Sequence, residues 1–303
     1  MRDSFIDDIK RQFRQGSALT KLIIINIAVF LLINIVDLIF FLFKIPSITT
    51  LCGNHVSFIT YWISVPADLT QLLFRPWTIF SYMFAHESVM HIVFNMIIFY
   101  FSGKIFLEYF NEKKLATTYI LGGLCGALVF IFSYNIFPIF RQSVDCAICL
   151  GASASVMAVM IAIASFVPNY TVHLILLGPV KLKYIAIIYV VIDIISIKSN
   201  NAGGHIAHLG GAMWGYFYIF QYKKGKDYAL VFGKISNFLT EILKRKSKLK
   251  VAHKKTSDSE YNFEKAHRQQ KIDFILDKIS KSGYESLSKE EKEFLFKASN
   301  KIV

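Results

Sequence analysis

The sequence predicts an all-α protein whose helices cross a membrane several times. Of its 303 residues, 54% are hydrophobic and 28 are phenylalanines, and the mean hydropathy is +0.45. The apolar residues are gathered in long blocks that are apolar on every side. A soluble protein of this length would instead spread them at helix or strand periodicity, so the blocks indicate a polytopic membrane protein.

The first apolar block is close to the ~20 residues that a helix needs to cross the hydrocarbon layer, whereas the fourth is short. The first block follows a charged stretch, is too long for a signal-peptide core and precedes no small-residue cleavage site, so it is interpreted as a span. A further apolar piece at 172–180 is broken by Gly178-Pro179 and is not counted. The six predicted spans cover about 22–43, 79–102, 115–137, 150–167, 184–197 and 205–222.

Lysine and arginine predict the orientation of the spans. They cluster before span one, between spans two and three, before span five and after span six. The positive-inside rule therefore places both termini in the cytoplasm, and spans two, four and six begin at the outer face.

Charge and polarity divide the chain into four predicted regions. These are a cytoplasmic segment 1–21, a membrane domain 22–222, a basic amphipathic segment and linker 223–268, and a small cytoplasmic helical hairpin 269–303. The net charge is +13, of which +9 comes from the 20 basic and 11 acidic residues after position 222. A basic tail beside a membrane favours anionic lipid as its partner, and no nucleic-acid-binding signature accompanies it.

The four cysteines, Cys52, Cys125, Cys146 and Cys149, do not form a disulfide framework. Cys146 and Cys149 form a CxxC without a second pair or nearby histidines, which disfavours zinc. Packing is the favoured role, with a labile disulfide as the alternative.

Three of the spans carry polar residues that such spans normally exclude, and these residues indicate a functional site. His91 and Asn95 are four residues apart in span two, so they share one helix face and can donate toward one point. Ser153 follows Gly151 at the start of span four, where unpaired backbone N–H groups favour a negative oxygen.

Span six contains His208, followed by Gly211 and Gly215 at a spacing that lets it pack closely on span four. From the predicted topology, the polar residues of spans two, four and six lie in one layer below the outer surface. A hydroxyl, an imidazole and a set of N–H donors are the parts required for acyl transfer.

The chain resembles the rhomboid intramembrane serine proteases over roughly residues 20–222. The resemblance rests on Gly-Ala-Ser at 151–153, Ala-His-Leu-Gly-Gly at 207–211 and His-Ile-Val-Phe-Asn at 91–95. The order of these motifs and the six predicted spans also fit that family. The fold it implies is a six-helix rhomboid-like bundle, with the C-terminal region outside the catalytic core.

The resemblance implies that Ser153 attacks a peptide carbonyl inside the membrane while His208 removes its proton. It implies a dyad with no acidic third member, no metal and no cofactor, in which packing holds the imidazole. His91, Asn95 and the Ser153 backbone N–H would stabilise the oxyanion. The expected partners are transmembrane protein substrates and the lipid bilayer, and the expected location is a bacterial inner membrane with the site opening to the non-cytoplasmic side.

Three positions depart from the family pattern. Ala154 stands where glycine is usual, and its methyl group is expected to narrow the site. The usual Trp-Arg pair of the first loop reads Trp77-Thr78. Met157 replaces a tyrosine that commonly stacks on the catalytic histidine, although a thioether can still pack on an imidazole.

Several neighbouring polar residues are given structural roles. Ser155 lies on a different helix face from Ser153, and His205 is expected nearer the surface than His208. His86 is expected to support the site or to cap a helix. Asn34, Asp37 and Asp193 are expected to form hydrogen bonds between helices.

Two other functions remain open. A catalytically silent relative that binds membrane clients would share the fold. A transporter of protons or small solutes would also use intramembrane histidines, but would not need Ser153.

Overall fold

The computed structural model describes residues 16–49, 55–174, 178–198, 201–228 and 258–299. Most of the predicted segment 1–21 and of the predicted linker at 223–268 lies outside these ranges. The chain separates into two compact units, 1–243 and 244–303, and each is described by itself.

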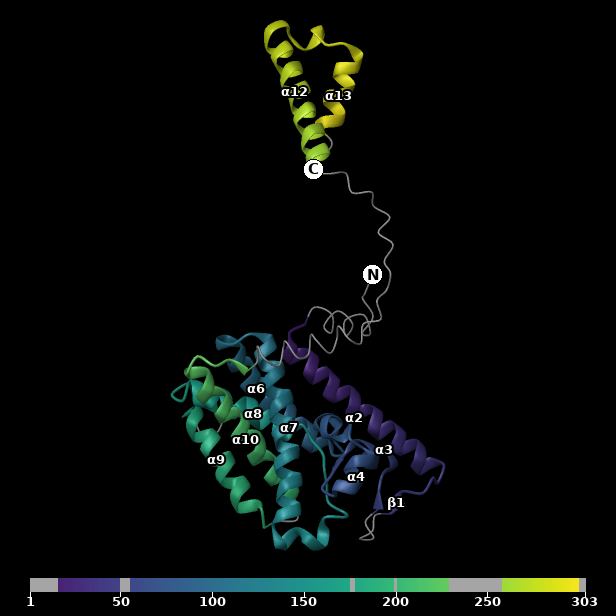
Figure 1. Ribbon diagram of the computed structural model, residues 1–303, viewed down its shortest axis with the longest axis vertical. Helices are drawn as coiled ribbons and strands as arrows, with labels where there is room; N and C mark the ends of the chain where they lie inside the picture. The colour runs from purple at the N-terminus through teal and green to yellow at the C-terminus, as the bar shows by residue number, and fades with distance from the viewer. Residues whose placement is uncertain (1–15, 50–54, 175–177, 199–200, 229–257, 300–303) are drawn as a thin grey trace. The chain divides into compact units, whose positions relative to one another are not determined.

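The first unit contains six helices that correspond to the six predicted spans (Figure 1). They are α2 (Ala18–Leu42), α6 (Val89–Tyr109), α7 (Glu112–Ile136), α8 (Ser153–Phe166), α9 (Leu182–Ser196) and α10 (Ala202–Lys223).

By length and composition, three of these helices, α2, α6 and α7, are suited to cross a membrane within the part of the chain described. Helix α8 is apolar but has only 14 residues, and α9 has 15. Helix α10 has 22 residues, but its glycines and histidines reduce its hydropathy. The membrane character of the unit is therefore clear, while the count of six crossings stays a prediction.

The second predicted span was placed too early. The sequence pattern put it at 79–102, whereas α6 begins at Val89, after two short helices α5 (Thr78–Ser81) and η1 (Tyr82–Phe84). Ser88 caps the N-terminus of α6, where its hydroxyl accepts a hydrogen bond from the His91 backbone N–H at 3.4 Å. Tyr82 and Met83 are buried inside the unit, so this apolar stretch is satisfied by protein packing and does not need lipid.

The connections between the long helices contain short strands and helices, so the fold is mostly rather than entirely α. The apolar piece at 172–180 is the antiparallel hairpin of β5 (Thr171–Leu174) and β6 (Gly178–Lys181). Strand β3 (Val65–Pro66) pairs with β4 (Ile148–Cys149) and so ties the first long connection to the chain just before α8. The remaining short elements are β1 (Ile48–Thr49), β2 (His55–Val56), α3 (Phe58–Ile63), α4 (Leu69–Phe74) and η2 (Pro138–Ser143).

Helix α8 forms the centre of the unit, with every residue from 154 to 164 buried. Glycines of α7 and α10 allow this burial. A Cβ added at Gly211 would lie 2.0 Å from the Ala154 carbonyl oxygen, and one at Gly215 would lie 2.3 Å from that of Ala158. The prediction that these two glycines let the sixth helix pack on the fourth is confirmed.

An arginine organises the connection between α2 and α6. Arg75 is buried, lies 3.7 Å from the centre of the Tyr61 ring, and donates to the Tyr61 carbonyl and to Gln71 Oε1. Trp77 stacks on Trp62 and donates to its carbonyl at 2.9 Å. The loop thus has a buried arginine two positions before Trp77, whereas Thr78 follows the tryptophan.

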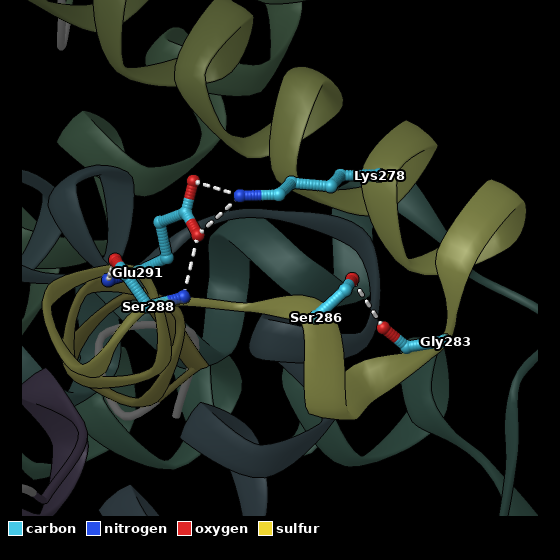
Figure 2. A network of polar contacts seen from close by, with 5 residues as sticks. All are labelled: Lys278, Gly283, Ser286, Ser288 and Glu291. Carbon is cyan, nitrogen blue, oxygen red and sulfur yellow. Dashed lines mark hydrogen bonds and ion pairs between the residues drawn. The ribbon is translucent and has the colours of Figure 1, made fainter.

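The second unit is a helical hairpin of α12 (Asp258–Ser282), η3 (Tyr284–Ser286) and α13 (Lys289–Ser299), so its first helix includes part of the predicted linker. Figure 2 shows the turn, where Glu291 accepts from the Ser288 backbone N–H at 2.8 Å and from Lys278 at 2.9 Å. The Ser288 N–H and then Lys278 lower the pKa of Glu291. Ser288 and Glu291 form a capping box, since the Glu291 N–H in turn donates to Ser288 Oγ.

Candidate active site

A cavity of about 240 Å³ lies among four helices of the first unit. Its polar lining consists of His91 and Asn95 from α6, Ser153 from α8, and His208 from α10. Tyr189 of α9 and several apolar residues complete the wall. The structure therefore brings together the four polar residues that the sequence singled out, although they lie on three helices far apart in the chain.

Ser153 is the first residue of α8, so its backbone N–H has no acceptor within the helix. The chain reaches this position through Gly151, whose φ of +126° is rarely adopted by residues with a side chain. A Cβ there would also lie 2.8 Å from Cε1 of His91. The Gly151 N–H donates to the Tyr82 carbonyl at 2.9 Å, which fixes the turn.

His86 supports this turn from the preceding connection. It is fully buried, and its Nε2 accepts from the Ala152 backbone N–H at 3.4 Å. Its ring centre lies 5.0 Å from that of His91. Of the two roles expected for His86, the structure favours support of the site, because Ser88 caps α6.

His91 and Asn95 line the same side of the cavity, as their spacing on one helix predicts. The Asn95 amide donates to the His91 backbone carbonyl at 2.9 Å. One of its two N–H bonds is therefore occupied within α6, and the other is available to a ligand. Ser153 and His208 line the same cavity, and no hydrogen bond joins these two residues in the structure.

The surroundings of His208 differ from the expectation that packing alone holds its imidazole. Nδ1 of His208 lies 2.9 Å from Oδ1 of Asp193 in α9, and Nδ1 of His205 lies 2.8 Å from the same oxygen. Asp193 does connect two helices, as predicted. Its partners were not predicted, and the available signal was an aspartate in one apolar helix followed by two histidines three residues apart in the next.

The ligand atoms of Asp193, His205 and His208 all lie within 4.8 Å of one another, a spacing that also suits a metal ion. The other two polar residues expected to join helices behave differently from Asp193. Asn34 donates to the Phe30 carbonyl of its own helix, and Asp37 has a buried oxygen without a hydrogen-bond partner among the described residues.

The departures at positions 154 and 157 have different consequences. The methyl group of Ala154 is buried against α7, where a Cβ on Gly126 would meet it at 2.6 Å, so it does not narrow the cavity as expected. Met157 lines the cavity. Tyr189, which sequence reasoning missed, also lines it and lies one helical turn before Asp193.

The cysteines near the site are not all packing residues. Cys146 is disulfide-bonded, whereas Cys125 and Cys149 are free. Cys146 and Cys149 therefore do not pair with each other.

Comparison with known proteins identifies the membrane unit. Residues 74–224 match the family described as the rhomboid domain. The chain contains a rhomboid domain. Residues 255–301, which include the whole of the α12–α13 hairpin, match a family of unknown function (DUF6576).

Three curated proteins share the rhomboid region. Presenilin-associated rhomboid-like protein A, mitochondrial, of Danio rerio is 29% identical over 169 residues, covering 53% of this chain and 40% of that protein. RHOMBOID-like protein 12, mitochondrial, of Arabidopsis thaliana is 29% identical over 45% of this chain and 43% of its own. The Presenilin-associated rhomboid-like protein, mitochondrial, of Rattus norvegicus is 26% identical over 60% and 45%.

The chain spans less than half the length of each of these relatives. Their names place them in mitochondria, so they do not support the expectation of a bacterial inner membrane. They do support a rhomboid protein that resides in a membrane.

Proposed function

We propose that the rhomboid domain is an intramembrane serine endopeptidase in which Ser153 is the nucleophile and His208 the general base. The observation that carries this proposal is the single cavity lined by both residues. The hydroxyl of Ser153 lies at a helix N-terminus, where backbone N–H groups and the helix dipole stabilise a developing negative charge.

The reaction follows from these positions. Nε2 of His208 accepts the proton of the Ser153 hydroxyl as Oγ bonds to the substrate carbonyl carbon, and the carbonyl π electrons move to the oxygen. Collapse of this intermediate breaks the C–N bond, and the imidazolium gives its proton to the leaving amine. Water then hydrolyses the acyl-enzyme by the same two transfers.

The lining of the cavity favours a hydrophobic substrate. Apart from the polar residues, the wall includes Phe94 and Ile98 of α6 and Met160 of α8. Phe94 is 60% exposed on the outside of the unit, so α6 is apolar both toward the cavity and toward its surroundings. This arrangement suits a segment that arrives from a bilayer, and we infer that transmembrane proteins are the substrates.

We further propose six membrane crossings with both termini on the cytoplasmic side, where the lysine clusters lie. The disulfide at Cys146 lies in the connection that leads into α8, and disulfides persist in oxidising compartments. Its position supports a cavity that opens to the side opposite the lysine clusters.

His91 and Asn95 are expected to stabilise the oxyanion. Replacing either residue with alanine should reduce kcat by roughly 10²–10³-fold and change KM little, because the lost interaction forms only in the transition state. Steady-state cleavage of a transmembrane substrate in detergent micelles measures both constants. A kcat unchanged by both substitutions would remove these residues from the mechanism.

Labelling of the purified protein with a fluorophosphonate tests the proposed function. The reagent should attach to one residue, identified as Ser153 by mass spectrometry, because only a serine activated by a base reacts with it. His208→Ala should abolish the labelling. Absence of labelling in folded wild-type protein would favour a silent client-binding relative, and solute uptake that tolerates Ser153→Ala would favour a transporter.

A further inference from the structure

The carboxylate of Asp193 connects two histidines inside the rhomboid domain. Asp193 is only 4% exposed, and its Oδ1 lies 2.8 Å from Nδ1 of His205 and 2.9 Å from Nδ1 of His208. Its Oδ2 has no hydrogen-bond partner among the described residues. A single carboxylate oxygen therefore contacts both imidazoles.

This geometry determines the tautomer of His208. An ionised carboxylate oxygen can only accept hydrogen bonds, so each Nδ1 that contacts it must carry the hydrogen. In a neutral imidazole, the hydrogen on Nδ1 leaves Nε2 with a free lone pair. Nε2 is the nitrogen that the proposed function requires as proton acceptor for Ser153.

We propose that Asp193 is a positioning residue for His208, so that the reacting unit is an array of Ser153, His208 and Asp193 instead of a dyad. This inference rests on the proposed function. When Nε2 takes the serine proton, the imidazolium carries a positive charge directly beside the carboxylate. Asp193 keeps its own negative charge throughout, and it returns no proton to the substrate.

His205 has a separate part in this arrangement. It precedes His208 by three residues, so both rings project from the same face of α10 toward α9. A carboxylate inside a membrane helix is costly unless donors surround it. The N–H of His205 supplies a second donor and holds the carboxylate in line with His208.

A hydrogen bond that merely joins α9 to α10 would explain the contacts without any catalytic consequence. The two roles differ in their effect on pH dependence. The titratable groups that face His208 are Asp193 and Tyr189 from α9, His205 from its own helix, and His91 from α6. Among them, Asp193 is the negatively charged one, so its removal should make protonation of the base harder.

The test is Asp193→Asn, compared with wild type and with Asp37→Asn, a matched carboxylate-to-amide change in α2. For Asp193→Asn we expect kcat to fall by about 10²–10⁴-fold, as loss of the carboxylate permits the wrong tautomer, while KM changes less than about threefold. The acid limb of the kcat/KM profile should move to lower pH, because a negative charge that favours the protonated base has been removed. Asp37→Asn should alter none of these quantities.

Companion variants keep the test informative if Asp193→Asn does not fold. His205→Gln retains an N–H donor and should keep kcat within about threefold of wild type, whereas His205→Leu should lower it by about tenfold. Asp193→Glu should recover part of the activity, because it restores the charge. Circular dichroism and thermal unfolding of each variant establish that the comparison is between folded proteins.

Three results would overturn the inference. One is a kcat for Asp193→Asn within about threefold of wild type. Another is a lower kcat for Asp193→Asn with no change in the acid limb of the kcat/KM profile, which would indicate that Asp193 only joins α9 to α10. The third is stoichiometric zinc in the purified protein that is lost from the Asp193 variant, which would assign the three residues to a metal site.

The proposed function fails separately. If Ser153→Ala cleaves a transmembrane substrate as fast as wild type, the serine protease assignment is wrong. If Ser153→Ala is inactive while Asp193→Asn shows the wild-type kcat and pH profile, only the positioning role of Asp193 is wrong.

Discussion

Replacing Ser153 with alanine is expected to abolish cleavage of a transmembrane substrate, with kcat reduced by roughly 10⁵–10⁶-fold. The substitution removes the attacking oxygen and leaves the α8 N-terminus and His208 in place. Without the hydroxyl, the cavity can still bind a substrate but cannot form the acyl-enzyme. Gel analysis of a reconstituted single-span substrate after long incubation measures the residual rate.

Ser155 provides a matched control two residues away on the same helix. It is fully buried, and its Oγ has no hydrogen-bond partner among the described residues, so its hydroxyl contributes little that alanine would lose. Ser155→Ala should retain near wild-type cleavage. Equal activity of Ser153→Ala and wild type, or a loss confined to Ser155→Ala, would contradict the assignment of the nucleophile.

Replacing Gly211 with alanine is expected to reduce both activity and stability. Its new Cβ would lie 2.0 Å from the carbonyl oxygen and 2.8 Å from the carbonyl carbon of Ala154, both of which belong to the backbone of α8. The helices must therefore separate, and displacement of a catalytic group by about 1 Å typically costs on the order of 10²-fold in rate. Overpacking of this kind also costs about 1–3 kcal/mol of stability.

Gly103→Ala is the control for this prediction. The added Cβ would lie 2.6 Å from Cδ1 of Leu19, the far end of a flexible side chain that can move aside. Thermal unfolding in detergent and substrate cleavage should change little for Gly103→Ala and strongly for Gly211→Ala. Wild-type activity of Gly211→Ala would mean that α8 and α10 do not approach as closely as described.

Except for α6, the positions of the long helices could be predicted from the sequence to within a few residues, because hydrocarbon and water select residue types over many consecutive positions. The start of α6 could not be predicted. The stretch before α6 includes Tyr82 and Met83, which are buried in protein, and hydropathy does not distinguish protein from lipid. Within the apolar piece at 172–180, β5 and β6 pair as antiparallel strands, which the hydropathy pattern did not predict.

At the candidate site, the sequence indicated His91, Asn95, Ser153 and His208, because polar groups are rare in spans unless they have a use. It did not indicate what surrounds them. The methyl group of Ala154 faces α7 instead of the cavity, and Tyr189 enters the wall from α9. Both facts depend on which face each helix turns toward its neighbours, and a local sequence pattern does not determine this.

The sequence by itself determined that this protein resides in a membrane, that it resembles the rhomboid family, and which hydroxyl and imidazole to test. Only the tertiary structure decided that His205 and His208 share one oxygen of Asp193. A hydrogen bond between helices requires two side chains to meet within about 3 Å. That separation depends on the packing of α9 against α10, to which many residues contribute and which no single motif encodes.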